Sequence, residues 1–342
     1  MISLINLDNS LDDKNRPIGH ELKMLKELPI ILNNQTEILA GKYYVQELSG
    51  KRQTLPFSLR IDSKKVYIKM LCNYFLSLIR AKGDLLVYID TSEAMLWGLA
   101  FFKGKRRIVS ITYTRWDIYI KKSLCQKPFR RFLVERALRK LDGCIVTNSS
   151  YKPEVPYVRV PDYYITDEIK KYQNRDKVRR CVCLGEIRKE KDVVGLVRVM
   201  NKTSISLLIA GSFQDEKIYH KVKKIKGDNI TIENKNIPYR VYMEYLSKYK
   251  YLMLPYDPKF YSIKTSGVLL EGIFVGAIPI APNSLLKQHQ IQGLGYQDIK
   301  EIPELINLYE NGKITVENHL EKYQYESYKN KIIDFFEEIN LS

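Results

Sequence analysis

Short runs of β-forming residues alternate with helical segments between residues 179 and 282. The runs CVCLG (181–185), ISLLIAG (205–211) and YLMLP (251–255) each lead into a segment typical of a helix. Strand, helix, strand at this spacing favours βαβ units, in which parallel strands form a sheet covered by helices on both faces. The sequence therefore predicts an α/β fold for this half of the chain.

The first half repeats the pattern less clearly, with strand candidates ISLINL, DLLVYID, RIVSITYT and CIVTNSS. A chain of 342 residues is longer than one core usually supports. We expect two Rossmann-like domains, residues 1–162 and 181–325, that face each other across a cleft. The polar stretch 163–180 is interpreted as a linker. An amphipathic helix within 326–342 is expected to pack back across the cleft, which is the default ligand site.

Several classes of protein do not fit this sequence. Only Cys181 and Cys183 lie close together among the five cysteines, and two thiols on one strand face are typical of core residues. The four histidines are scattered, so we expect neither a metal site nor a bound cofactor. No apolar run approaches the ~20 residues of a membrane-spanning helix, and the N-terminus resembles a strand more than an export signal. We expect a cytoplasmic protein.

The segment TSGVLLEGIFVGAIPI (265–280) places one carboxylate in an apolar helix. Ser266 is a favoured N-cap, and the free N–H groups at Thr265–Val268 would bind an anion, with Gly267 allowing a phosphate to approach the backbone. Glu271 lies on the face of Gly267, about 6 Å along the axis, which is close to the separation between a diphosphate and its ribose. Ribose hydroxyls would satisfy the carboxylate. Alternatively, Glu271 pairs with a basic residue or reaches solvent.

A second anion signal is LGEIRKEKD (184–192), which follows a strand. Arg188 and Lys191 are three residues apart and would point the same way, so that they could clamp a diphosphate leaving group. A solvated basic pair is the alternative interpretation. The sequence contains neither a P-loop motif nor a G-x-G-x-x-G motif, which argues against enzymes built on those loops.

These segments carry a resemblance. CLGEIRKEKDVVGLVRVM, SLLIAGSF, YMEYLSKYKYLMLPY and TSGVLLEGIFVGAIPIAP resemble, in order and spacing, the donor-binding half of GT-B glycosyltransferases of the large GT4-like group. VERALRKLDGCIVTNSS and VRVPDYY are similar to the end of the acceptor-binding domain in these enzymes. The resemblance covers roughly residues 130–282. It implies a GT-B fold and transfer of a sugar from a nucleotide sugar, without a bound metal, in the interdomain cleft.

The resemblance also implies a donor site, formed by Gly185, Arg188, Lys191, Pro238, Thr265, Ser266, Gly267 and Glu271. In this site the two basic residues contact the diphosphate, Ser266 and Gly267 cap it, and Glu271 holds the ribose. Asn236–Pro238 would border the base.

The chain departs from the family pattern at three positions. Ile263 replaces a frequent acidic residue, Glu186 replaces an arginine after the loop glycine, and Tyr113 replaces a frequent histidine. Retention or inversion at the sugar therefore stays open. Inversion needs a general base on the acceptor side, for which the candidates are Asp90, His20, Asp12 and Asp13. Each of these is alternatively a cap, a surface charge or a loop residue.

Basic residues are concentrated in the first half. Residues 101–140 hold 13 basic and 2 acidic residues, and residues 1–160 carry +13 of the net charge of +17. Such a field suits a polyanion, either a membrane or a nucleic acid. Residues 103–140 interleave cations with Trp116, Tyr119, Phe129 and Phe132, and residues 64–83 form a basic amphipathic helix, which favours an anionic membrane surface. The alternative is an inward apolar face with a solvated basic outer face.

The leading hypothesis is therefore a glycosyltransferase at the inner face of the membrane that extends a lipid-linked oligosaccharide for a surface polysaccharide or glycan. A sugar-nucleotide epimerase is the first alternative, although the loop 256–265 offers only Asp257 as an acid or base. A basic nucleic-acid-binding protein is the second, but no nucleic-acid-binding motif is present, so no nucleic acid partner is expected.

Overall fold

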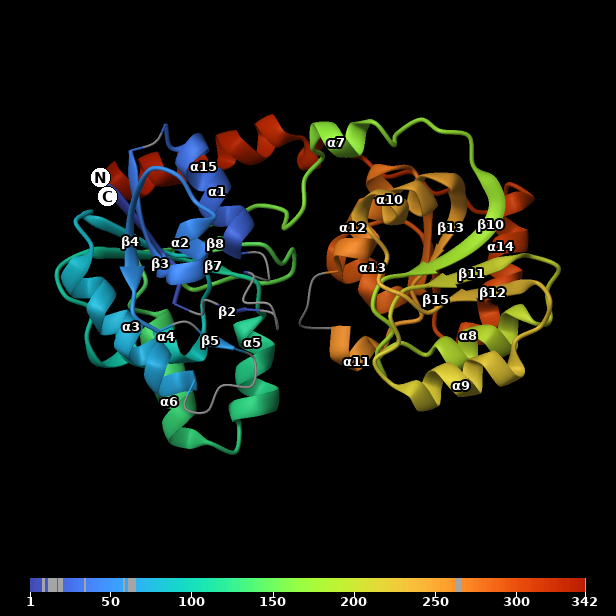
Figure 1. The fold of residues 1–342 in the computed structure, drawn as a ribbon, viewed down its shortest axis with the longest axis horizontal. Coiled ribbons are helices and arrows are strands. Elements are labelled where there is room, and N and C mark those ends of the chain that lie inside the picture. Colours follow the sequence, from blue (N-terminus) through green and yellow to red (C-terminus); the bar gives the residue numbers. More distant parts are fainter. Residues whose placement is uncertain are drawn as a thin grey trace. The chain divides into compact units, whose positions relative to one another are not determined.

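The structure is a computed structural model that describes residues 1–7, 10–11, 17, 21–33, 35–57, 59–60, 66–261 and 266–341. The chain forms two compact units (Figure 1). The first comprises residues 1–161 and 328–342, and the second comprises residues 162–327. Each unit is built on one large sheet whose strand pairs are all parallel.

The first unit has a seven-stranded sheet in the order β4-β3-β1-β6-β7-β8-β9. Its strands are β1 (Ile2–Ile5), β3 (Thr36–Gly41), β4 (Lys51–Leu55), β6 (Leu85–Tyr88), β7 (Arg107–Thr112), β8 (Gly143–Val146) and β9 (Tyr157–Arg159). The short strands β2 (Ser10–Leu11) and β5 (Leu59–Arg60) pair separately. The direction in which strands are added reverses between β1 and β6, which gives a Rossmann-like switch point.

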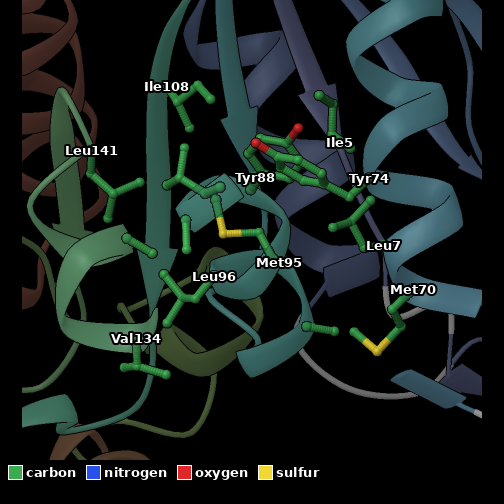
Figure 2. Packing of buried hydrophobic residues seen from close by; sticks show 14 of the residues in the cluster. Ile5, Leu7, Met70, Tyr74, Tyr88, Met95, Leu96, Ile108, Val134 and Leu141 are labelled. Atoms are coloured by element: carbon green, nitrogen blue, oxygen red, sulfur yellow. The ribbon is translucent and has the colours of Figure 1, made fainter. Parts of the chain in front are cut away.

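Helices cover both faces of this sheet. One face carries α3 (Val66–Arg80), α4 (Glu93–Phe101), α5 (Trp116–Tyr119), the π-helical turn η1 (Ile120–Leu124) and α6 (Pro128–Leu138). Figure 2 shows their core, in which Tyr74 of α3 lies beside Tyr88 of β6. The other helices of the unit are α1 (Glu21–Ile31), α2 (Lys42–Gln46) and α15 (Tyr325–Leu341). α15 is joined to α1 by a contact between the Tyr328 hydroxyl and Met24 Sδ.

The second unit has a six-stranded sheet in the order β12-β11-β10-β13-β14-β15. Its strands are β10 (Val178–Leu184), β11 (Leu207–Ala210), β12 (Ile230–Glu233), β13 (Tyr249–Met253), β14 (Ile278–Pro282) and β15 (Leu294–Tyr296). This is the doubly wound order of Rossmann domains. The switch point lies between β10 and β13, and the carboxyl ends of these strands are where such folds bind ligands.

Alternating side chains of β10 divide the core of the second unit into two layers. Val182 and Leu184 pack with α7 (Asp167–Lys170), α10 (Tyr239–Lys248), α12 (Gly267–Phe274) and α13 (Asn283–His289). Cys181 and Cys183 pack on the other face with α8 (Val193–Met200), α9 (Glu216–Ile225) and α14 (Ile302–Glu310). The remaining elements are α11 (Pro258–Tyr261), η2 (Ile299–Glu301) and η3 (Glu321–Tyr323). The prediction that both cysteines are core residues is confirmed.

The expected strands and helices named in the sequence analysis are present, including the C-terminal helix. Residues 163–180, interpreted as a linker, belong instead to the second unit, because Ile165, Ile169 and Tyr172 are buried in its core. α15 belongs to the first unit from Tyr328 onward, and its Phe335 and Ile339 lie against Gly143 of β8.

A buried carboxylate joins three segments at the amino edge of the first sheet. Glu37 is 3% exposed and accepts hydrogen bonds from Ser3 Oγ at 2.6 Å, from Gly83 N at 3.2 Å and from Lys82 N. Burial by itself raises the pKa of Glu37, but these hydrogen bonds outweigh it and hold the pKa below its ordinary value of 4.5. The interaction thus stabilises the fold above pH 4.5 and is lost as the pH falls below this value.

We expect Glu37→Ala to lower the free energy of unfolding by about 3 kcal/mol at pH 7, because it leaves buried donors unpaired. The loss should shrink as the pH falls below 4.5. Urea unfolding can be followed by tryptophan fluorescence, since both tryptophans of the chain, Trp97 and Trp116, lie in the first unit. Asp84→Ala removes an exposed carboxylate near the same edge and should change little. An equal effect of the two substitutions would contradict the expectation.

Candidate functional site

The loops that follow β10 and β13 are held together at the switch point of the second unit. Asp192 N donates to Pro255 O at 2.7 Å, and Asp257 N donates to Glu190 O at 2.8 Å. Lys191 and Tyr256 form an antiparallel bridge between these two bonds. These backbone hydrogen bonds fix both loops. They therefore also fix the backbone position from which the side chain of Lys191 extends.

Lys191 carries a buried ammonium at this point. The residue is 6% exposed, and its Nζ donates to Leu184 O at 3.1 Å and lies 5.3 Å from the centre of the Tyr256 ring. Tyr261 of α11 stacks on Tyr256 with the ring centres 3.9 Å apart. Burial lowers the pKa of Lys191, because a buried cation loses hydration. Among the described residues no carboxylate forms an ion pair with this ammonium, although the charge of Glu186 favours it from a distance, so an anionic ligand would supply a direct partner.

The N-terminus of α12 lies beside the same loop. Gly185 has a φ of +85°, which favours glycine, and a Cβ on Gly185 would lie 3.6 Å from Val268 Cγ2 and 3.8 Å from Lys191 Nζ. Ser266 is the N-cap, and its Oγ accepts from Leu269 N at 3.3 Å. The cap predicted from the sequence is therefore confirmed. The N-terminus of α12 and the ammonium of Lys191 both lie near Gly185. The positive end of the helix dipole and the charge of the lysine therefore act at the same place.

Gly267 has a neighbour that the sequence did not predict. A Cβ at Gly267 would lie 2.6 Å from Cζ and from the hydroxyl oxygen of Tyr163, so the tyrosine ring packs directly on the backbone here. The prediction that Gly267 allows a phosphate to approach is untested. In this structure it is the ring of Tyr163 that leaves no room for a Cβ at Gly267.

Glu271 is 8% exposed and is held by hydroxyl groups. Tyr242 donates to its Oε2 at 2.7 Å, and Tyr239 donates to its Oε1 at 3.3 Å. Both tyrosines come from α10, which begins directly after Pro238. The carboxylate therefore bonds hydroxyl groups, which is the chemistry expected of a ribose contact, but protein side chains provide them here.

Arg188 and Lys191 differ in environment. The side chain of Arg188 is 50% exposed and its Nε donates to Glu186 Oε2 at 2.6 Å, so a local carboxylate pairs with it. Lys191 is the buried member of the pair. Thr265 and Ile263 lie outside the described residues.

Of the candidate bases on the acceptor side, Asp90 is described. It follows β6 at the carboxyl edge of the first sheet and is partly buried. His20, Asp12 and Asp13 lie outside the described residues. Within the described ranges, no group of three or more His, Cys, Asp or Glu side chains is placed to hold a metal ion.

The helices α3, α4 and α6 pack side by side on the first sheet and, with the residue that follows α4, expose a set of apolar side chains, here called the outer apolar set. It consists of Tyr67, Ile68, Phe75, Ile79, Phe101, Phe102, Phe129 and Phe132. The expectation that Trp116 belongs to an interfacial surface is wrong, because Trp116 is 3% exposed. Tyr119 is partly buried and its hydroxyl donates to Glu93, and its place at an interface stays a prediction. No helix in the described ranges is both long and apolar enough to cross a membrane.

Sequence reasoning missed the tyrosines of the site: Tyr163, Tyr239, Tyr242, Tyr256 and Tyr261. The chain has 25 tyrosines, so their number alone is not a local signal. The spacing of Tyr239 and Tyr242, three residues apart, does place both on one helix face, and it could have indicated a shared partner.

Comparison with known proteins shows similarity at the level of the fold. No protein-family model matches the chain, and no curated protein matches it by sequence. A sucrose-phosphate synthase from Thermosynechococcus elongatus has a TM-score of 0.68 at 14% identity, with 99% of each chain covered. A glycosyltransferase from Rickettsia africae has a TM-score of 0.56 at 11% identity, with 98% of this chain and 94% of that chain covered.

An enzyme of another class is also similar. A UDP-GlcNAc 2-epimerase from Neisseria meningitidis, bound to UDP-GlcNAc, has a TM-score of 0.59 at 10% identity, with 99% of this chain and 100% of that chain covered. The similarity extends over whole chains, so it includes both parallel-sheet units. The prediction of an α/β fold with two Rossmann-like domains is confirmed, and the chain has the GT-B fold.

Proposed function

We propose that this protein is a glycosyltransferase that transfers a sugar from a nucleoside-diphosphate sugar to a hydroxylated acceptor. The observation that carries the proposal is the buried ammonium of Lys191 beside the N-terminus of α12, at the switch point of a GT-B fold. Two positive groups at this edge suit a diphosphate. The similarity to a sucrose-phosphate synthase and to a second glycosyltransferase supports the same class.

In the proposed reaction, the bond between the anomeric carbon and the diphosphate oxygen breaks, and a bond from that carbon to an acceptor oxygen forms. The negative charge that develops on the leaving diphosphate is stabilised by Lys191 and by the first N–H groups of α12. Glu271 binds the ribose, and the segment before Tyr239 borders the base. The acceptor proton leaves to a base, for which Asp90 and His20 are the candidates if the configuration inverts. Hexosyl transfer without a metal remains part of the proposal.

The acceptor is proposed to be lipid-linked, in the synthesis of a surface glycan or polysaccharide. The support is the outer apolar set together with the charge of residues 101–140, which hold 13 basic and 2 acidic residues. Exposed aromatic side chains among cations suit an anionic membrane surface. The proposed location is the cytoplasmic face of the membrane, bound through residues 64–83 and 103–140.

The class can be tested by titrating UDP, GDP and ADP, and then their sugars, into the protein by calorimetry. The expected result is binding of a nucleoside diphosphate, followed by its release from the matching nucleotide sugar when acceptor lipid is added. A nucleotide sugar whose sugar isomerises without acceptor would favour the epimerase, as the similarity to a UDP-GlcNAc 2-epimerase allows. Salt-sensitive binding of nucleic acid, with no binding of nucleotides, would overturn the proposal.

Glu271→Gln is expected to weaken nucleoside diphosphate binding about tenfold, because a neutral amide is a weaker acceptor for ribose hydroxyls than a carboxylate. Calorimetry measures the change. Glu310→Gln is the matched control: Glu310 also accepts from a tyrosine, Tyr251, at 2.6 Å, and it pairs with Arg179 near the start of β10. The ribose role fails if Glu271→Gln binds the nucleotide as tightly as the wild type.

A further inference from the structure

The two tyrosines that hold Glu271 are not equivalent. The hydroxyl of Tyr242 lies 2.7 Å from Oε2 and its ring is partly buried in the core of the second unit. The hydroxyl of Tyr239 lies 3.3 Å from Oε1, and this residue is 46% exposed. A hydrogen bond of the first length is strong when its acceptor is charged, whereas the second is at the long end of the range. One contact is thus short and internal, and the other is long and open to solvent.

Both hydroxyl groups are fixed as donors. Burial and the neighbouring charge of Glu271 raise the pKa of Tyr239 and of Tyr242, so both hydroxyl groups keep their protons at neutral pH. Their rings are also stacked, with centres 6.0 Å apart and planes 24° apart, so the side chain of Tyr239 lies along that of Tyr242. An ionised carboxylate only accepts hydrogen bonds, so a ribose hydroxyl binds Glu271 as a donor and competes with the donors already in place. A ribose hydroxyl can therefore replace the weaker donor while the stronger one stays in place.

We propose that Tyr242 is a positioning residue that fixes the Glu271 carboxylate, and that Tyr239 is an exchangeable donor that occupies Oε1 until a ribose hydroxyl takes its place. The inference rests on the proposed function, because it assumes that Glu271 meets the sugar of a nucleotide. It adds a consequence for specificity: the pair makes the site prefer ribose over deoxyribose. Without Tyr242 the carboxylate would turn, and the ribose hydroxyls would lose an oriented acceptor.

The experiment compares three ligands, UDP and its 2′-deoxy and 3′-deoxy forms, by calorimetry; the GDP or ADP series is used if that base binds more tightly. Tyr242→Phe is expected to weaken UDP about tenfold while leaving the weaker-binding deoxy form nearly unchanged, so that the preference for ribose disappears. Tyr239→Phe is expected to keep the preference and to bind UDP equally or up to about threefold more tightly, because a competing donor is gone.

Tyr245→Phe provides the matched control. Tyr245 lies on the same helix and donates to another carboxylate, Glu233, at 2.9 Å, so its removal should alter neither affinity nor preference. If Tyr242→Phe weakens ribose and deoxyribose forms equally, Tyr242 is only structural and the inference fails. If Tyr239→Phe weakens UDP as much as Tyr242→Phe does, Tyr239 is not exchangeable and the inference also fails.

These outcomes separate the inference from the proposed function. A wild-type protein that binds a nucleoside diphosphate while the tyrosine variants behave alike overturns the inference alone. A wild-type protein that binds none overturns both. Tyr239→Phe alters an exposed side chain, so this variant is expected to fold. Its result shows whether Tyr239 is exchangeable even if Tyr242→Phe does not fold.

Discussion

Replacement of Lys191 by methionine is expected to weaken nucleoside diphosphate binding by about 100-fold. The same substitution should leave the midpoint of thermal unfolding unchanged or higher. In the wild type Lys191 is 6% exposed, and its ammonium donates to one carbonyl, Leu184 O, at 3.1 Å. Burial lowers the pKa of Lys191, which means that the fold disfavours the charge that the proposed ligand requires. Methionine retains the apolar stem and removes that charge.

The two readouts together distinguish a functional lysine from a structural one. A lysine that only supports the loop between β10 and α8 would lower stability when removed, and any loss of binding would follow from that. Lys189→Met is the matched control, because Lys189 is an exposed cation in the same loop. Undiminished affinity in Lys191→Met would remove the main support for a diphosphate site, and so would an equal loss in Lys189→Met.

The strands CVCLG, ISLLIAG and YLMLP of the second unit could be predicted because each follows a local rule. Val182 and Leu184 face one layer while Cys181 and Cys183 face the other, so residues 181–184 of β10 form an unbroken apolar run that is recognisable as a buried parallel strand. In the first unit, β3 and β4 were not predicted. Glu37 interrupts the apolar run of β3, and its carboxylate is buried there only because Ser3 and the backbone after α3 donate to it. A tertiary network of this kind has no signature in the strand itself.

The candidate site divides in the same way. The N-cap at Ser266 is a local feature and was predicted correctly. The partners of Glu271 come from α10, 29 and 32 residues earlier, and their choice depends on how α10 and α12 pack. The spacing of Arg188 and Lys191 suggested a clamp, but it could not indicate that Glu186 pairs with Arg188 or that Lys191 is buried.

Substitution of Phe129 and Phe132 together by serine is expected to weaken binding to anionic vesicles by about 100-fold. These side chains are 65% and 53% exposed on α6, and no other described residue buries them. Transfer of each phenylalanine into the interface contributes about 1.5 kcal/mol, so the two together contribute about 3 kcal/mol, or roughly 100-fold in affinity. The charge of the helix stays the same, because phenylalanine and serine are both neutral, and Arg130 and Arg131 keep their partners Glu93 and Glu135.

Vesicle sedimentation measures this effect, with phosphatidylglycerol in phosphatidylcholine as the anionic surface and pure phosphatidylcholine as the neutral one. Binding by the wild type should fall when salt is raised, since cations near the surface contribute to the attraction. Ile30→Ser is the matched control, because Ile30 is 64% exposed but belongs to α1 and not to the outer apolar set. If the double variant and Ile30→Ser bind vesicles alike, the phenylalanines do not insert. The basic charge of the first unit would then call for a different polyanion, and the case for a lipid-linked acceptor would lose its structural support.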